Sequence, residues 1–137
     1  MNNPHELSHY ARVTNYAYKT LRRLLPGPYT FVLEGSREVP KMMLTRRKTA
    51  GIRVPDHPIC LAIVQALGNP LLSTSASDPE GRPLLTAWEI DQALGRQLDL
   101  IVDGGPVPGL PSSVVSLVDD QPEILREGAG PVEEFRV

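Results

Sequence analysis

The fold class is indicated most clearly by residues 49–68, which read TAGIRVPDHPICLAIVQALG. Thr49–Val54 is a short, largely apolar run that stops at Pro55, as is typical of a strand. Pro58 then stands at a helix start, and apolar residues follow at helical spacing: Leu61, Ala62, Val64 and Leu67. Gly68 ends the helix. The stretch therefore predicts one strand–helix step of an α/β fold.

The flanking sequence continues this alternation in both directions. Toward the N-terminus the same signals predict helices over about 3–10, 14–25 and 40–47 and a strand over 29–33. Toward the C-terminus they predict strands over 71–75, 99–102, 112–118 and 123–126, a polar loop over 78–83, and a helix opened by Thr86 and Glu89. Strands that alternate with helices and end in a strand pair predict an α/β layer fold with a mixed sheet.

Length and composition set limits on the class of protein. The 137 residues, with 41% apolar and 22% charged residues, fit one globular domain with a single core, and residues 131–137 look like a tail. A net charge of −2 argues against a globally basic nucleic-acid binder. One cysteine excludes an intramolecular disulfide, three widely spaced histidines suggest no metal site, and no apolar run could span a bilayer. We expect a soluble, cytoplasmic protein without a membrane partner.

Two strands carry candidate binding residues. Thr49, Gly51 and Arg53 share one strand face because side chains alternate, and Gly51 leaves room for a ligand between a hydroxyl and a guanidinium. Ser73, Ser75 and Ser77 follow the same rule at the carboxyl end of the next strand, where α/β sheets bind ligands. These groups suit phosphate or carboxylate oxygens. Strand-end serines are more often turn formers, and strand arginines more often surface ion-pair partners, so these alternatives stay open.

Several other residues have structural interpretations that outweigh functional ones. We expect His57 to be a helix-start residue, Cys60 a buried small hydrophobe and Trp88 a core residue. Asp103-Gly104-Gly105 is better explained as a turn than as a metal loop. The basic run Arg46-Arg47-Lys48 is usually a solvated surface, although it is the best local candidate for an anionic partner.

Five ordered segments over about a hundred residues carry a resemblance to the YrdC family. They are LPGPYTFVL at 25–33, GIRVPDHP at 51–58, LSTSA at 72–76, DGG at 103–105 followed by PSSVV at 111–115, and ILREG at 124–128. Residues 41–53 and the Arg126-Glu127-Gly128 ending are most similar to the YciO branch. The resemblance implies a twisted mixed sheet with helices packed against it and an open concave ligand face.

The resemblance also implies an activity and a set of binding residues. Members of the wider family make L-threonylcarbamoyladenylate from threonine, bicarbonate and ATP, release pyrophosphate, and so serve threonylcarbamoyl-adenosine modification of tRNA. ATP would be a substrate, with Mg²⁺, and no bound organic cofactor is implied. Carried over by position, the threonine-site residues are Arg53, Ser73 and Ser112, and the nucleotide-site residues are Thr49, Ser75, Ser77 and Arg126. The resemblance assigns no catalytic residue and no metal ligand.

The chain departs from the family pattern in two places. The family's N-terminal portion, with its KxR basic pair, has no counterpart here, so residues 1–130 resemble the C-terminal two thirds of the family domain. Ser77 stands where the family has asparagine. Missing strands would leave sheet edges and an apolar face uncovered, so we expect a fragment of a longer protein or a chain that associates through those edges.

Three functions therefore remain open at the level of sequence. The first is a threonylcarbamoyl-AMP synthase or a close relative. The second is a non-catalytic module that binds nucleotide, double-stranded RNA or tRNA, and the third is an inactive fragment.

Overall fold

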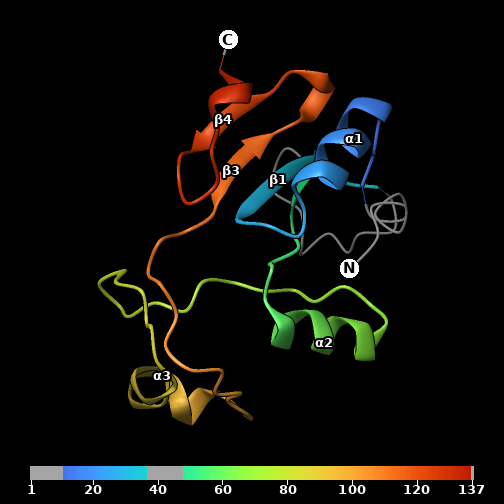
Figure 1. Ribbon diagram of the computed structural model, residues 1–137. Helices are drawn as coiled ribbons and strands as arrows, with labels where there is room; N and C mark the ends of the chain where they lie inside the picture. Colours follow the sequence, from blue (N-terminus) through green and yellow to red (C-terminus); the bar gives the residue numbers. More distant parts are fainter. Residues whose placement is uncertain (1–10, 37–47, 137) are drawn as a thin grey trace. The chain divides into compact units, whose positions relative to one another are not determined.

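The computed structural model describes residues 11–36 and 48–136 (Figure 1). The helices expected over 3–10 and 40–47, and Arg46 and Arg47 of the basic run, lie outside the described residues. The chain divides into two compact units, Met1–Leu71 with Pro111–Val137 and Leu72–Leu110. Sequence analysis expects a single core, whereas the contacts within the structure form these two units.

The first unit is built on a four-stranded mixed sheet. Its strands are β1 (Tyr29–Glu34), β2 (Thr49–Arg53), β3 (Ser113–Ser116) and β4 (Glu123–Arg126), in the order β2-β1-β3-β4. β1 pairs with β2 antiparallel and with β3 parallel, and β4 pairs with β3 antiparallel. All four strands were expected from their apolar and β-branched runs, and the mixed sheet is confirmed.

The core of this unit lies on one face of the sheet. Alternate residues of β1 point into it, so Tyr29, Phe31 and Leu33 are buried. α1 (Asn15–Leu24) packs there through Ala17 and Leu21 (Figure 1). The predicted cap of this helix is confirmed, because the Thr14 hydroxyl oxygen accepts a hydrogen bond from the Ala17 N–H at 3.1 Å.

The C-terminal residues complete this core. Val132 and Phe135, the latter in the 3₁₀ turn η5 (Glu133–Phe135), are buried against it. The Phe135 ring meets Phe31 edge to face at 6.1 Å, and the Tyr29 hydroxyl donates to the carbonyl of Pro131 at 2.8 Å. Residues 131–136 are thus packed, whereas sequence analysis takes 131–137 as a tail. The two apolar side chains among charged residues explain the packing, because burying them removes apolar surface from water.

α2 (Pro58–Leu67) has the predicted bounds. Its N-cap is His57, whose Nδ1 accepts from the Ile59 N–H, and it ends at Gly68 in the left-handed conformation with φ of 75°. None of its residues is buried, and Cys60 is exposed, contrary to the expectation of a buried thiol. No helix in the described part of the chain combines the length and apolar character needed to cross a membrane.

The second unit contains α3 (Ala87–Leu94) and the 3₁₀ turn η3 (Gly95–Gln97). The predicted cap is confirmed, since Thr86 accepts from the Glu89 N–H, while the Glu89 carboxylate accepts from the Leu85 N–H. The strands expected over 71–75 and 99–102 are wrong, because neither segment has a strand partner among the described residues. No residue between 72 and 110 is buried, so Trp88, 70% exposed, is not a core residue here.

Candidate functional site

The sheet face opposite the core carries the polar side chains. Strand register places Arg53 beside Thr30, Thr30 beside Val114, and Val114 beside Arg126. Directly paired residues of neighbouring strands project from the same face, so this row crosses all four strands. We call this side of the sheet the open face. It unites residues from four segments that are distant in sequence.

The centre of the open face is a hydrogen-bonded group formed by Thr30, Ser112 and Arg126. The hydroxyl oxygens of Thr30 and Ser112 lie 2.8 Å apart. Arg126 donates from Nε to the Ser112 main-chain oxygen at 2.9 Å and from Nη2 to the Ser112 Oγ at 3.2 Å. Ser112, expected in the threonine site, therefore contacts Arg126, expected in the nucleotide site. Ser112 is 3% exposed, so Thr30 and Arg126 are the members that solvent reaches most easily.

Arg53 is the cation on the open face for which the described residues provide no partner. It is exposed at the end of β2, and no described residue forms a hydrogen bond or ion pair with its guanidinium. Thr49 shares its strand face and is half-buried, as the alternation predicts. The surface ion-pair alternative for Arg53 thus finds no partner among the described residues. A guanidinium in this state can take a carboxylate or phosphate through two parallel hydrogen bonds.

Gly51 lies between Thr49 and Arg53, but its space faces a protein group. A β-carbon at position 51 would sit 3.2 Å from the Thr30 methyl carbon, which is closer than ordinary van der Waals contact. Sequence analysis reserves this space for a ligand. The Thr30 methyl group occupies part of this space, because residues 51 and 30 occupy neighbouring positions on adjacent strands.

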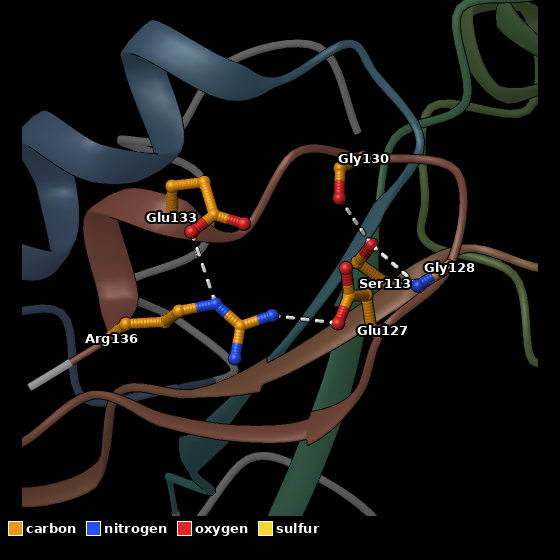
Figure 2. Close-up of polar contacts among 6 residues, drawn as sticks. All are labelled: Ser113, Glu127, Gly128, Gly130, Glu133 and Arg136. Carbon is orange, nitrogen blue, oxygen red and sulfur yellow. Dashed lines mark hydrogen bonds and ion pairs between the residues drawn. The ribbon is translucent and has the colours of Figure 1, made fainter.

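The loop after β4 is anchored close to this group (Figure 2). The buried Ser113 hydroxyl donates to the carbonyl of Gly130 and accepts from the Gly128 N–H at 2.9 Å. Arg136 joins the carboxylates of Glu127 at 2.7 Å and Glu133 at 3.1 Å. The Ala129 N–H donates to the Pro111 carbonyl at 2.9 Å. These contacts tie the segments on either side of Ser112 and Arg126 together.

The serine run lies in the second unit. Ser73 and Ser75 are exposed in irregular backbone, and Ser77 forms a single bridge with Pro83 at the base of a turn. Within that turn the Asp78 carboxylate accepts from the Arg82 N–H at 2.8 Å, and this hydrogen bond lowers the pKa of Asp78. Because the strand expected over 71–75 is absent, the argument from alternation on one strand face does not apply to these serines. Their binding roles stay predictions.

Thr30 is the residue that sequence reasoning gave no role. The alternation of β1 could have placed it, because Tyr29, Phe31 and Leu33 face the core and Thr30 must face the other way. Its contact with Ser112 could not have been found in this way, since it depends on the parallel register between β1 and β3.

Metal ligands are scarce in the described part of the chain. Residues 11–36 and 48–136 contain no group of three or more His, Cys, Asp or Glu side chains that could hold a metal ion.

Comparison with known proteins finds relatives over nearly the whole chain. The Sua5–YciO–YrdC family model, described as "Telomere recombination", matches residues 1–128. YciO of Escherichia coli K12, an uncharacterized protein, is 44% identical over 140 residues, which covers 95% of this chain and 64% of YciO. The crystal structure of E. coli YciO superimposes with a TM-score of 0.92 at 42% identity, covering 99% of this chain and 67% of that one.

More distant relatives have named activities. A threonylcarbamoyl-AMP synthase of Pyrococcus abyssi is 33% identical over 116 residues, 83% of this chain and 34% of its own length. A crystal structure of P. abyssi Sua5 complexed with L-threonine superimposes with a TM-score of 0.84 at 28% identity, covering 96% of this chain and 39% of that one. The chain thus spans about two thirds of YciO and a smaller share of these longer proteins.

Proposed function

Since this chain belongs to the Sua5–YciO–YrdC family, we propose that its open face binds L-threonine and ATP for threonylcarbamoyl-AMP synthesis. Relatives in the family are named threonylcarbamoyl-AMP synthase, and P. abyssi Sua5 has been crystallised with L-threonine. The observation that carries the proposal is the exposed Arg53 guanidinium, which has no partner among the described residues and shares a sheet face with Thr30, Ser112 and Arg126.

In this proposal the cationic groups on the open face bind the anionic groups of the two ligands. Arg53 holds the threonine carboxylate by two parallel hydrogen bonds, the arrangement that guanidinium groups favour. Arg126 supplies positive charge to the nucleotide, and Thr49 supplies a hydroxyl. Ser112 would line the threonine site. Ser73, Ser75 and Ser77 lie in the second unit, and their roles at the threonine and nucleotide sites rest on the family resemblance alone.

The proposed reaction needs positioning more than it needs a nucleophilic side chain. The threonine amine adds to bicarbonate, and loss of water gives a carbamate. A carbamate oxygen then attacks the α-phosphorus of ATP, the bond to the β-phosphate oxygen breaks, and pyrophosphate leaves. The product is a mixed anhydride of the carbamate with AMP. Fixed hydrogen-bond donors that hold these anions together and exclude water would supply the rate enhancement.

Two limits define what the chain itself is proposed to do. It spans 64% of the length of E. coli YciO. Ligand binding is therefore proposed for these residues, and synthesis of threonylcarbamoyl-AMP is proposed for the whole protein. The described residues offer no cluster of metal ligands, so Mg²⁺ is treated as part of the ATP substrate. The net charge of −2 gives no support to the alternative of double-stranded RNA binding.

The test begins with binding. Calorimetric titration of the purified chain with L-threonine and with ATP should show binding of both, and Arg53→Ala should weaken L-threonine about tenfold to a hundredfold, the range for hydrogen bonds to charged groups. Arg96→Ala, which removes another exposed arginine, from η3, is the matched control and should bind normally. Unchanged L-threonine affinity in Arg53→Ala would refute the assignment.

Pyrophosphate release distinguishes the remaining alternatives. Release from ATP that requires both threonine and bicarbonate identifies a synthase. Binding of both ligands without release identifies the non-catalytic module, and no binding of either ligand identifies the inactive fragment.

A further inference from the structure

We propose that Thr30 is a positioning residue of this site, which fixes the direction of the Ser112 hydroxyl and, through it, the place of the Arg126 guanidinium. The inference rests on the proposed function, because the site it organises is the one proposed to bind L-threonine and ATP. It adds a residue that influences the ligand site through its contact with Ser112, without a proposed ligand contact of its own.

The orientation of Thr30 is set from two sides. Its methyl carbon faces Gly51 of β2, where a β-carbon would come within 3.2 Å. Its hydroxyl oxygen lies 2.8 Å from the Ser112 Oγ on the β3 side. Rotating the side chain to another staggered position would lose the hydrogen bond, so the empty space above Gly51 and the hydroxyl of Ser112 select one rotamer.

This rotamer has a consequence for the proton of Ser112. A serine hydroxyl has two acceptor lone pairs and one hydrogen to donate. Arg126 Nη2 occupies one lone pair at 3.2 Å. Either hydroxyl can be the donor of the Thr30–Ser112 hydrogen bond, and when Thr30 donates, it occupies the other lone pair. The single Ser112 hydrogen is then available only to an acceptor. In this arrangement the group favours an oxyanion, a carboxylate or phosphate oxygen, over an amine or another donor.

The same contacts hold Arg126. An arginine side chain on the surface samples many rotamers, and ordering it costs entropy. Here Nε and Nη2 both bond to Ser112, one to its main-chain oxygen and one to its hydroxyl. Without the Thr30 hydroxyl, the Ser112 hydroxyl is free to turn, and Arg126 loses the more distant of its two anchors.

The test compares Thr30→Val, which keeps the shape but lacks the hydroxyl, with Thr30→Ser, which keeps the hydroxyl. Thr20→Val is the matched control, because Thr20 is a buried threonine of α1 whose hydroxyl donates to the Tyr16 carbonyl at 3.0 Å, outside the site. The first readout is solvent exchange of the Arg126 Nη2 hydrogens by NMR, which needs no ligand and reports the contact with the Ser112 Oγ. The second is the dissociation constant for L-threonine and for ATP.

We expect Thr30→Val to speed exchange of the Arg126 Nη2 hydrogens and to weaken ligand binding, each about fivefold to tenfold, the loss expected for one hydrogen bond. Thr30→Ser should restore both within about twofold, and Thr20→Val should leave both unchanged. A nonspecific effect of replacing a partly buried threonine by valine would appear in Thr20→Val as well.

The two proposals fail in different ways. Wild-type exchange in Thr30→Val, or equal losses in the valine and serine variants, overturns the role of Thr30 even if Arg53→Ala abolishes L-threonine binding. If the wild-type chain binds neither L-threonine nor ATP, the proposed function fails, and the exchange measurement still decides whether Thr30 positions Arg126.

Discussion

The two units of the chain differ in how their apolar residues are used. In the first unit, strands brought together from distant parts of the sequence bury Phe31, Leu33 and Val115 almost completely. The second unit, Leu72–Leu110, contains comparable apolar residues but buries none of them, and Leu100 and Trp88 are 79% and 70% exposed. Local signals are satisfied in both units, since α1 and α3 each begin at a threonine cap.

The difference shows that a segment can form the helix that its sequence predicts without becoming part of a buried core. A helix cap is satisfied within four residues of chain. A buried strand needs partners on both edges and a covered face, and these come from distant residues. The first unit has such partners, and the following predictions test whether the contrast between the units holds in solution.

The largest expected contrast comes from removing one aromatic ring in each unit. Phe31 is fully buried, stacked on Tyr29 at 5.5 Å and edge to face with Phe135. Phe31→Ala should lower the free energy of unfolding by about 4 kcal/mol, because it removes buried surface and leaves a cavity. Trp88→Ala should change it by less than about 0.5 kcal/mol, as for an exposed site. Urea unfolding followed by circular dichroism measures both.

The Trp88 variant also reports on association. If Trp88→Ala destabilises the protein as strongly as Phe31→Ala, the indole is covered in solution and the contrast between the units is broken. Repeating the unfolding at several protein concentrations distinguishes coverage by a second molecule, which makes stability depend on concentration, from coverage within the chain.

The strands of the first unit were largely predictable from sequence because each is a short apolar or β-branched run between proline, glycine or turn residues. The same reasoning failed for 71–75 and 99–102, which have similar composition. Strand propensity describes a residue's fit to a half-buried pleated surface, so it cannot tell whether a partner is present. Trp88 was wrongly expected in the core for the same reason. The sequence predicts its helix, but it does not show which surface would cover the indole.

The candidate site was predictable in parts. Alternation along one strand correctly joined Thr49 and Arg53 on one face, and the family resemblance singled out Ser112 and Arg126. Neither could show that Thr30 links them, because that contact depends on the register of β1 against both β2 and β3. Gly51 shows the same limit, since its space is visible in the sequence while the methyl group that faces it is not.

A smaller contrast is expected from the two helix caps. Thr14 caps α1 and its hydroxyl also donates to the Asp120 carboxylate at 2.6 Å, which joins the helix to a distant turn. Thr14→Ala should therefore lower the free energy of unfolding of the first unit by about 1 to 2 kcal/mol. Thr86→Ala removes only a local cap and should reduce the helicity of α3 without moving that transition. Amide hydrogen exchange, resolved by segment, separates the two effects, and a common shift in both units would show that they unfold together.

The smallest contrast concerns two carboxylates whose pKa values are lowered. Arg23 donates from Nη1 to Glu134 at 2.9 Å, and this contact between α1 and the C-terminal segment holds the pKa of Glu134 below its usual value. The pKa of Asp78 is lowered chiefly by the hydrogen bond from the Arg82 backbone N–H within its own turn. A carboxylate lowered on folding adds stability above its unfolded pKa and loses it as the pH falls through its folded pKa.

Of these two carboxylates, only Glu134 should therefore make the first unit less stable in acid. Both partners are about half exposed, so solvent screening limits the contribution to about 0.5 kcal/mol at neutral pH, disappearing below the folded pKa of Glu134. Arg23→Gln should raise the pKa of Glu134 in an NMR titration and remove this part of the pH dependence. Arg82→Gln should leave the stability of the first unit unchanged, and should raise the pKa of Asp78 only in part, because the backbone N–H of residue 82 remains. Equal effects of the two variants on the first unit would mean that the turn of the second unit supports the sheet, and the distinction between the units would have to be withdrawn.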